Sequence, residues 1–178
     1  MLLRMRRFAA GLVMAGLGLV LNSAAGTRLD AQTMAVAKGE AGMHKVSGPF
    51  EVKMAPQKPD NPQAEGAGLG RMSIDKQFHG ALEATSQGEM LSVLDREKGS
   101  GGYVALERVT GTLEGKNGSF VLQHDATMNR GVPAMTIIVV PDSGTGELIG
   151  ISGTMKVRIE AGGKHFYDFE YTLDSAAH

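Results

Sequence analysis

The stretch from residue 74 to residue 90, IDKQFHGALEATSQGEM, gathers side chains of the types that acid and base catalysis uses. These are Asp75, Lys76, His79, Glu83 and Glu89. Its alternation predicts two antiparallel strands joined by a turn at Gly80 and Ala81. One face of the first strand carries Ile74, Lys76 and Phe78. Most of the charges fall on the other, polar face, which contacts solvent or a wet lumen, so a hairpin explains the stretch better than catalytic machinery does.

Ionisable residues that interrupt apolar faces are better candidates for function. In YVALERVTGTLE, Glu107 lies in phase with Tyr103 on the more apolar side, and in FVLQHDATM, His124 shares the apolar face. His165 lies on the apolar face of HFYDFEYTL. Buried ionisable groups are costly unless they are paired, so these side chains are expected to contact one another, a Tyr hydroxyl or water. The candidate ligand-binding residues are Tyr103, Glu107, His124 and His165.

This set of four residues has three interpretations. The first is a core network whose hydrogen bonds are all satisfied and which fixes strand register. The second is a polar group of side chains that orients a ligand in an apolar pocket. The third is a catalytic site in which a residue with a shifted pKa transfers a proton. No residue is assigned as catalytic, and whether the protein is an enzyme is left open.

Several kinds of chemistry lack their usual signature. The chain has no cysteine, which excludes disulfides, Cys-ligated metals and a thiol nucleophile. Its histidines lack H-x-H or H-E-x-x-H spacing, no G-x-S-x-G occurs, and GTGELIG precedes a strand instead of the helix that a phosphate-binding loop needs. We therefore expect no metal and no cofactor. The formal net charge of −1, without a basic run beyond the N-terminus, argues against nucleic acid as a partner.

The elements that must position these residues are strands. The chain has 25 Gly and 5% aromatic residues, and its period-two segments are separated by Gly-containing turns, which is typical of an all-β protein. Eight strands are expected, at residues 48–54, 71–79, 82–91, 102–114, 119–128, 134–140, 148–160 and 164–173. Eight antiparallel strands in a mostly up-and-down meander can close into a barrel. A barrel is the predicted fold, and an open sandwich is the alternative.

The register between two of these strands decides whether Glu107 meets His124. Asn117-Gly118 is the strongest two-residue hairpin signal in the chain. If this turn sets the register, Glu107 lies four places from the residue opposite His124, whereas a slip of two residues brings the pair into diagonal contact. Both registers remain open at the level of sequence.

The first residues indicate an export signal. Arg4, Arg6 and Arg7 precede an apolar and Gly run at residues 8–21, and small residues follow, which is the order of a secretory signal peptide. The run is shorter than the roughly 20 residues that a membrane helix needs. The protein is therefore expected to be secreted or periplasmic, without a stable membrane anchor after cleavage. The alternatives are a retained anchor and a start codon assigned too early. The expected parts are a signal peptide at 1–25, a flexible segment at 26–46 and a single barrel domain at 47–174.

Three long phrases of the sequence resemble a known bacterial family. They are LGRMSIDKQFHGALEATSQGEML, GYVALERVTGTLEGKNGSFVLQHDATMNRG and VVPDSGTGELIGISGTMKVRIEAGGKHFYDFEYTL. The family is catalogued as domain of unknown function 3224, and the resemblance extends from about Gly48 to Leu173. It implies an eight-stranded barrel similar to plant allene oxide cyclase and no established activity. Ala81 departs from the family pattern, which has an acidic residue there, so no site can be built on a carboxylate at this position.

The sequence and the resemblance together predict an exported β-barrel protein that binds a small apolar ligand inside the barrel. The alternatives are a cyclase-like or isomerase-like enzyme that uses the buried Glu and His, and a structural or assembly module without a ligand. An assembly module would show an exposed apolar patch. Because allene oxide cyclases and the similar dirigent proteins are oligomeric, the resemblance also implies a homo-oligomer.

Overall fold

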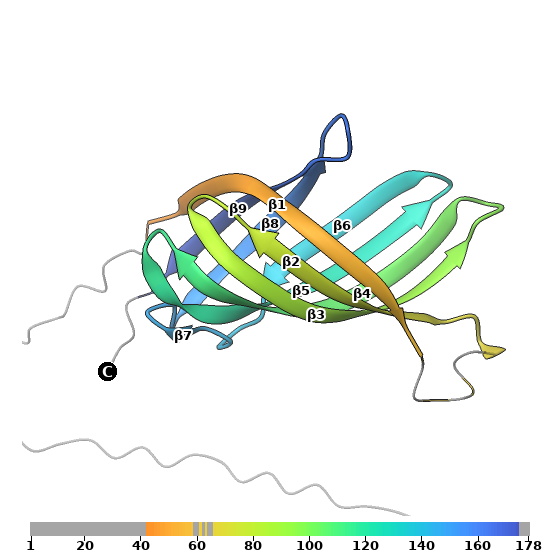
Figure 1. Cartoon of the computed structure of the whole chain (residues 1–178), viewed down its shortest axis with the longest axis horizontal. Coiled ribbons are helices and arrows are strands. Elements are labelled where there is room, and N and C mark those ends of the chain that lie inside the picture. Colours follow the sequence, from red (N-terminus) through yellow and green to blue (C-terminus); the bar gives the residue numbers. More distant parts are fainter. Residues whose placement is uncertain (1–41, 59–60, 62, 64–65, 175–178) are drawn as a thin grey trace, which may run out of the picture. The chain divides into compact units, whose positions relative to one another are not determined.

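The computed structural model describes residues 42–58, 61, 63 and 66–174. In this part of the chain no helix is long and apolar enough to cross a membrane. The predicted signal peptide, and the predicted flexible segment as far as residue 41, lie outside the described residues. Figure 1 shows the described strands coiling around a common axis.

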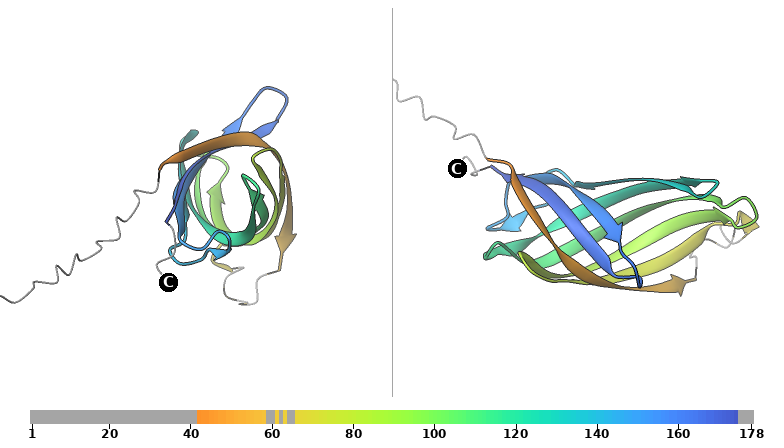
Figure 2. Two further views of the ribbon diagram at one scale, coloured as in Figure 1. Left: turned by 90° about the vertical axis from the view of Figure 1, so that its left-hand side faces the viewer. Right: turned by 90° about the horizontal axis from the view of Figure 1, so that it is seen from above.

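The described chain forms one antiparallel sheet that closes on itself. Its strands are β1 (His44–Gln57), β2 (Gly70–Phe78), β3 (Leu82–Asp95), β4 (Ser100–Leu113), β5 (Lys116–Asn129), β6 (Val132–Val139), β7 (Thr145–Gly146), β8 (Ile151–Ile159) and β9 (His165–Leu173). The pairing order is β4, β3, β2, β1, β9, β8, β6, β5, and β5 pairs with β4, which closes the barrel (Figures 1 and 2). The two-residue strand β7 pairs with β5. The predicted eight-stranded barrel is confirmed.

Period-two alternation decides which side chains fill the barrel. In β9, Tyr167, Phe169 and Tyr171 are buried, while the residues between them are partly exposed. Together with Phe78 and Phe120 they form the centre of the main core. Each fully buried side chain of this size stabilises the fold by about 1.5–3 kcal/mol relative to an exposed one.

The first strand is longer than expected. β1 begins at His44, within the predicted flexible segment, because residues 44–50 pair with β9. An ion pair at the surface supports this extension, with Lys45 Nζ 2.8 Å from Glu170 Oε1.

The hairpin between β4 and β5 turns at Glu114 and Gly115, so the predicted turn at Asn117 and Gly118 is wrong. Both turn residues have positive φ, 48° for Glu114 and 80° for Gly115, as a type I′ turn requires. Gly118 lies in β5, where β7 passes close to it. A Cβ on Gly118 would lie 2.1 Å from the Thr145 carbonyl oxygen. The Asn-Gly pair therefore marks a close approach of two strands instead of a turn.

The barrel is closed at one end and splayed at the other. β1 pairs with β9 only as far as Phe50, and β6 pairs with β8 only through Ile138 and Thr154. Beyond these points β1 to β6 continue as a curved sheet, and in Figure 1 β3 to β6 reach farther to the right than β8 and β9. We call this part the open end. Its free edges, as far as the described chain goes, are residues 51–57 of β1 and 132–137 of β6.

Candidate functional site

A buried ion pair lies between the main core and the open end. Lys76 Nζ is 2.8 Å from Glu107 Oε1, and the two side chains are 7% and 0% exposed. The Ser86 hydroxyl donates to Glu107 Oε2 over 3.4 Å. Lys76 Nζ also lies over the rings of Phe50 and Phe78, 5.3 and 5.7 Å from their centroids. This largely buried lysine is therefore stabilised by one carboxylate and two aromatic faces.

The strand register explains how a side chain on β2 reaches one on β4. Across β3, Lys76 faces Ser86 and Glu107 faces Gly88. Because Gly88 has no side chain, Lys76 can extend diagonally across β3 to the carboxylate. A Cβ on Gly88 would lie 2.6 Å from the Glu107 Cβ and 2.4 Å from the Leu106 carbonyl oxygen. Glycine at this position therefore allows β3 and β4 to approach closely at Glu107.

His124 completes a group that we call the polar cluster, which consists of Lys76, Ser86, Glu107 and His124. On β5, His124 lies opposite Ala105, and Glu107 lies opposite Leu122, so Glu107 and His124 are diagonal neighbours. His124 Nε2 is 3.4 Å from Glu107 Oε1, a contact whose geometry falls short of a hydrogen bond. This nitrogen is fully buried and has no hydrogen-bond partner among the described residues.

The polar cluster holds Glu107 as an anion. Burial alone would raise the pKa of the Glu107 carboxyl, but the neighbouring His124 and the charge of Lys76 outweigh burial and lower this pKa. Burial, and then the charge of Glu107, raises the pKa of the nearby Tyr103 hydroxyl. The site thus combines one positive and one negative charge with a phenol that stays protonated at neutral pH.

Three of the four predicted site residues come together, and the fourth lies apart. The ring centroids of Tyr103 and His124 are 6.5 Å apart, and the Tyr103 hydroxyl donates to Met135 Sδ over 3.8 Å. His165 is half-buried, and its ring packs against Phe50 with centroids 5.3 Å apart. His165 therefore belongs to the aromatic packing around Phe50 and not to the polar cluster.

Sequence reasoning overlooks Lys76 and Ser86, the other two members of the polar cluster. The signal that identifies Glu107 and His124 is present here as well, because Lys76 interrupts the apolar face of β2. It is hidden by the surrounding charges of the hairpin, which lie on the outer face.

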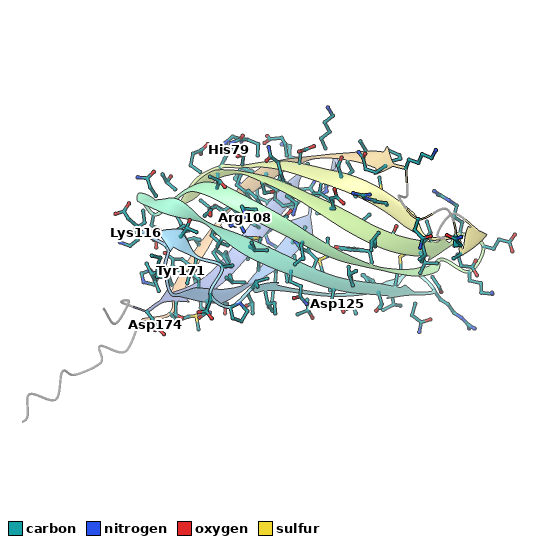
Figure 3. All side chains as sticks on the ribbon, turned by 90° about the horizontal axis from the view of Figure 1, so that it is seen from below. His79, Arg108, Lys116, Asp125, Tyr171 and Asp174 are labelled. Atoms are coloured by element: carbon teal, nitrogen blue, oxygen red, sulfur yellow. The ribbon has the colours of Figure 1, made fainter. Side chains whose placement is uncertain are left out.

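The remaining charges of the 74–90 stretch lie at the surface, which is one of the two locations expected for the polar face. His79, in the loop between β2 and β3 (Figure 3), contacts two carboxylates. Its Nε2 is 3.0 Å from Glu51 Oε2, and its Nδ1 is 3.2 Å from Glu83 Oε1. These three side chains are at least 40% exposed, so solvent screens their interactions.

Methionines line the inner face of the open end. The strand pairing places five of them on this face: Met54, Met72, Met90, Met128 and Met135. Met90 is buried with Ile74 and Ala105 in a small second core. Met54 and Met135 are 43% and 48% exposed, so solvent reaches this part of the inner face. Flexible thioether side chains adapt to apolar partners of varied shape.

The outer face of the barrel wall carries an apolar groove. The groove has a volume of about 1070 Å³ along β2 to β5 and adjoins a concavity of about 420 Å³. We call both together the outer groove, and its apolar lining includes Leu69, Leu91, Val93, Val104, Leu106 and Val121. Leu91, Val104 and Leu106 are each more than half exposed. Arg108 and Asp125 add charges of both signs (Figure 3).

Comparisons with known proteins agree with the fold and leave the activity open. The family described as "Protein of unknown function (DUF3224)" matches residues 46–171. A protein of unknown function from this family, from Shewanella oneidensis, has a crystal structure and is 50% identical to this chain in sequence. The two structures align with a TM-score of 0.70. The match covers 76% of this chain and 100% of that chain. No curated protein matches. The chain therefore belongs to the DUF3224 family, a family of unknown function, and shares its barrel fold with the Shewanella oneidensis member.

Proposed function

We propose that this protein binds a small apolar molecule on the inner face of the open end, beside the polar cluster. The observation that carries the proposal is the buried His124 Nε2 nitrogen, which has no hydrogen-bond partner among the described residues. A buried polar atom left without a partner costs about 1–3 kcal/mol. A ligand that supplies the missing partner offsets this cost.

The surroundings of the polar cluster support an apolar ligand. Aromatic side chains fill the closed end, so the accessible part of the interior is the methionine-lined face of the open end. Binding sites for small molecules typically combine an apolar lining with a few polar groups that fix orientation. The open end offers this combination, with Met54, Met72 and Met135 near Tyr103 and the polar cluster.

A matched pair of variants tests where an apolar molecule binds. Met135 on the inner face and Leu106 in the outer groove are 48% and 56% exposed. Titration with the neutral fluorescent dye Nile red should show that Met135→Asp weakens binding at least about tenfold, because the dye would desolvate the new charge. Leu106→Asp should leave the affinity unchanged. The reverse pattern would assign binding to the outer groove and overturn the proposal.

An enzymatic role of the same site is the first alternative. A cyclase-like or isomerase-like reaction would use Glu107 as a base, since its carboxylate is ionised and lies 3.4 Å from His124. In that case Glu107→Gln, assayed under conditions in which circular dichroism shows it folded, would abolish turnover of a bound substrate while binding of the substrate persists.

The outer groove supports a second candidate, an assembly module. Exposed apolar patches of this kind mark protein interaction sites. Under this reading the partner covers the groove, and the polar cluster serves only to fix the alignment of β2, β4 and β5.

Export is a further part of the proposed function. It is supported by Arg4, Arg6 and Arg7 and by the apolar run at residues 8–21, all outside the described residues. After expression in a bacterial host, cell fractionation with intact-mass measurement should find a protein shortened by residues 1–25 outside the cytoplasm. An unprocessed protein in the cytoplasm would contradict export.

A further inference from the structure

The polar cluster contains nitrogen atoms that lack a full set of hydrogen-bond partners among the described residues. Both acceptor oxygens of Glu107 are engaged, Oε1 by Lys76 and Oε2 by Ser86. An ammonium group has three N–H donors, and within the described residues Glu107 is the one hydrogen-bond acceptor for Lys76. The His124 Nε2 nitrogen has no acceptor there either. Two N–H groups of Lys76, and the Nε2–H of His124 in the tautomer that carries its proton there, are thus left for another acceptor.

The Tyr103 hydroxyl is a hydrogen-bond donor that can exchange its present acceptor for another one. Its hydroxyl donates to Met135 Sδ over 3.8 Å, and a thioether sulfur is a weak acceptor. An oxygen acceptor that approaches from the open end can replace this bond at little cost. The group that complements this site is therefore a hydrogen-bond acceptor.

The charge balance of the cluster selects among acceptors. The positive charge of Lys76 and the negative charge of Glu107 lie 2.8 Å apart and offset each other. A carboxylate would bring a second negative charge into this buried site, and an amine would add a positive charge and more donors. Either change leaves a poorly compensated charge in a region of low polarity, which is costly. A neutral acceptor avoids both costs.

We propose that the molecule bound at the open end is a neutral carbonyl compound with an apolar tail, a ketone or an ester, whose carbonyl oxygen accepts hydrogen bonds from Lys76 and His124. Both nitrogens contact the same carboxylate oxygen, Glu107 Oε1, so they are neighbours that one oxygen can reach. The tail lies on the methionines of the inner face. The inference rests on the proposed function of this site and adds the chemical class of its ligand.

Isothermal titration calorimetry with three probes of similar chain length tests this class. The probes are methyl heptyl ketone, nonanoate and nonylamine, which carry a neutral acceptor, an anion and a cation on an apolar tail. The wild type should bind the ketone at least about tenfold more tightly than either charged probe, because each uncompensated buried charge costs more than the hydrogen bonds gain.

A double variant separates head-group recognition from apolar binding. Lys76→Met together with Glu107→Leu replaces the ion pair by apolar groups of similar size, a change that buried ion pairs often tolerate. It should bind the ketone about tenfold more weakly than the wild type does, through loss of the charge-assisted hydrogen bond. Met155→Leu, a change in the main core at the closed end, should leave the affinity for the ketone unchanged.

The outcomes distinguish this inference from the function it rests on. If the wild type binds a charged probe as tightly as the ketone, or if the double variant keeps the full affinity for the ketone, the proposed ligand class is overturned while apolar binding stands. If none of the three probes binds and Nile red does not bind either, the proposed function falls together with the ligand class.

Discussion

Burying the Glu107 carboxylate costs desolvation free energy, and the neighbouring Lys76 and Ser86 reduce that cost. The side chain is 0% exposed, yet it carries a charge that is compensated by Lys76 and bonded by Ser86. Buried ion pairs contribute little net stability because desolvation opposes the attraction, although breaking one is strongly destabilising. The ion pair therefore makes the fold depend on the alignment of β2 with β4. Gly88, on the intervening strand β3, leaves room for the Glu107 side chain.

Removing the charge of Glu107 alone should destabilise the barrel strongly. Glu107→Gln leaves the Lys76 ammonium buried without a counter-charge, at a cost of about 3–5 kcal/mol. Lys76→Met with Glu107→Leu removes both charges and should be as stable as the wild type to within about 1 kcal/mol, or more stable. Urea unfolding followed by circular dichroism measures the free energies. An equally large loss in both variants would contradict a paired role.

The lowered pKa of Glu107 makes the free energy of unfolding depend on pH. A Glu side chain titrates at about pH 4.3 in an unfolded chain, and Glu107 titrates lower in the folded one. The unfolded state therefore binds more protons, and the contribution of Glu107 is complete above the unfolded pKa and is lost as pH falls through the folded pKa. Below about pH 4 the wild type should lose stability relative to the variant that lacks Lys76 and Glu107.

Urea unfolding of both proteins at a series of pH values checks this dependence. The other carboxylates are common to both proteins, so the difference between their free energies of unfolding isolates the pair. A difference that stays constant from neutral pH to about pH 3 would rule out a lowered pKa for Glu107.

Gly88 should tolerate no side chain. Gly88→Ala places a Cβ 2.4 Å from the Leu106 carbonyl oxygen and 2.6 Å from the Glu107 Cβ, and overpacking of this kind costs about 1–3 kcal/mol. Gly66 has no atom within 4 Å of a Cβ position, so Gly66→Ala should change stability by less than about 0.5 kcal/mol. Thermal unfolding compares the two variants, and similar melting temperatures would count against the close approach at Gly88.

At the scale of elements, the turn between β4 and β5 determines the site. Two glycines of this hairpin have different roles. Gly115 adopts the positive φ that the turn requires, and Gly118 leaves room for the close approach of β7. Gly118→Ala should cost more than Gly115→Ala, because its Cβ meets the Thr145 carbonyl oxygen at 2.1 Å, whereas a Cβ at Gly115 meets no atom within 4 Å. The cost at Gly115 is that of positive φ alone, about 1–2 kcal/mol.

Amide hydrogen exchange separates the two glycine variants. The Ser119 N–H donates to Thr145 Oγ1 over 3.0 Å, so loss of β7 exposes it. Its exchange should accelerate in Gly118→Ala and stay slow in Gly115→Ala. Unchanged exchange in Gly118→Ala would contradict the close approach of β7 to Gly118.

Strands and faces could be predicted from the sequence because alternation is local. The phase of a single strand places Glu107 and His124 on the buried face in any register that shifts by an even number of residues. The register between β4 and β5 follows from the turn at Glu114 and Gly115, whereas the strongest local turn signal, Asn117-Gly118, lies where β7 approaches β5. Local pattern is also insufficient for Lys76, whose partner depends on the alignment of three strands, and for His165, which shares a face with the cluster but not its position.

At the scale of the whole barrel, the two sides of the wall offer different surfaces. The inner face of the open end combines methionines with the polar cluster. The outer groove is lined by apolar residues and by charges of both signs, and its Leu91, Val104 and Leu106 are each more than half exposed. The proposed ligand site therefore lies on the inner face, and the outer groove is the surface proposed for contact with a protein.

We propose that two copies of the chain associate through the outer groove. Arg108 and Asp125 lie along it, so a two-fold arrangement can bring the positive charge of one copy to the negative charge of the other. Leu106→Glu should raise the dissociation constant at least about tenfold, because it buries an unpaired charge. Ile159→Glu, at a residue that is 68% exposed and outside the groove, is the matched control. Sedimentation velocity over a range of protein concentrations should show a dimer for the control and a monomer for Leu106→Glu, whereas a monomeric wild type at every concentration would leave the groove without this partner.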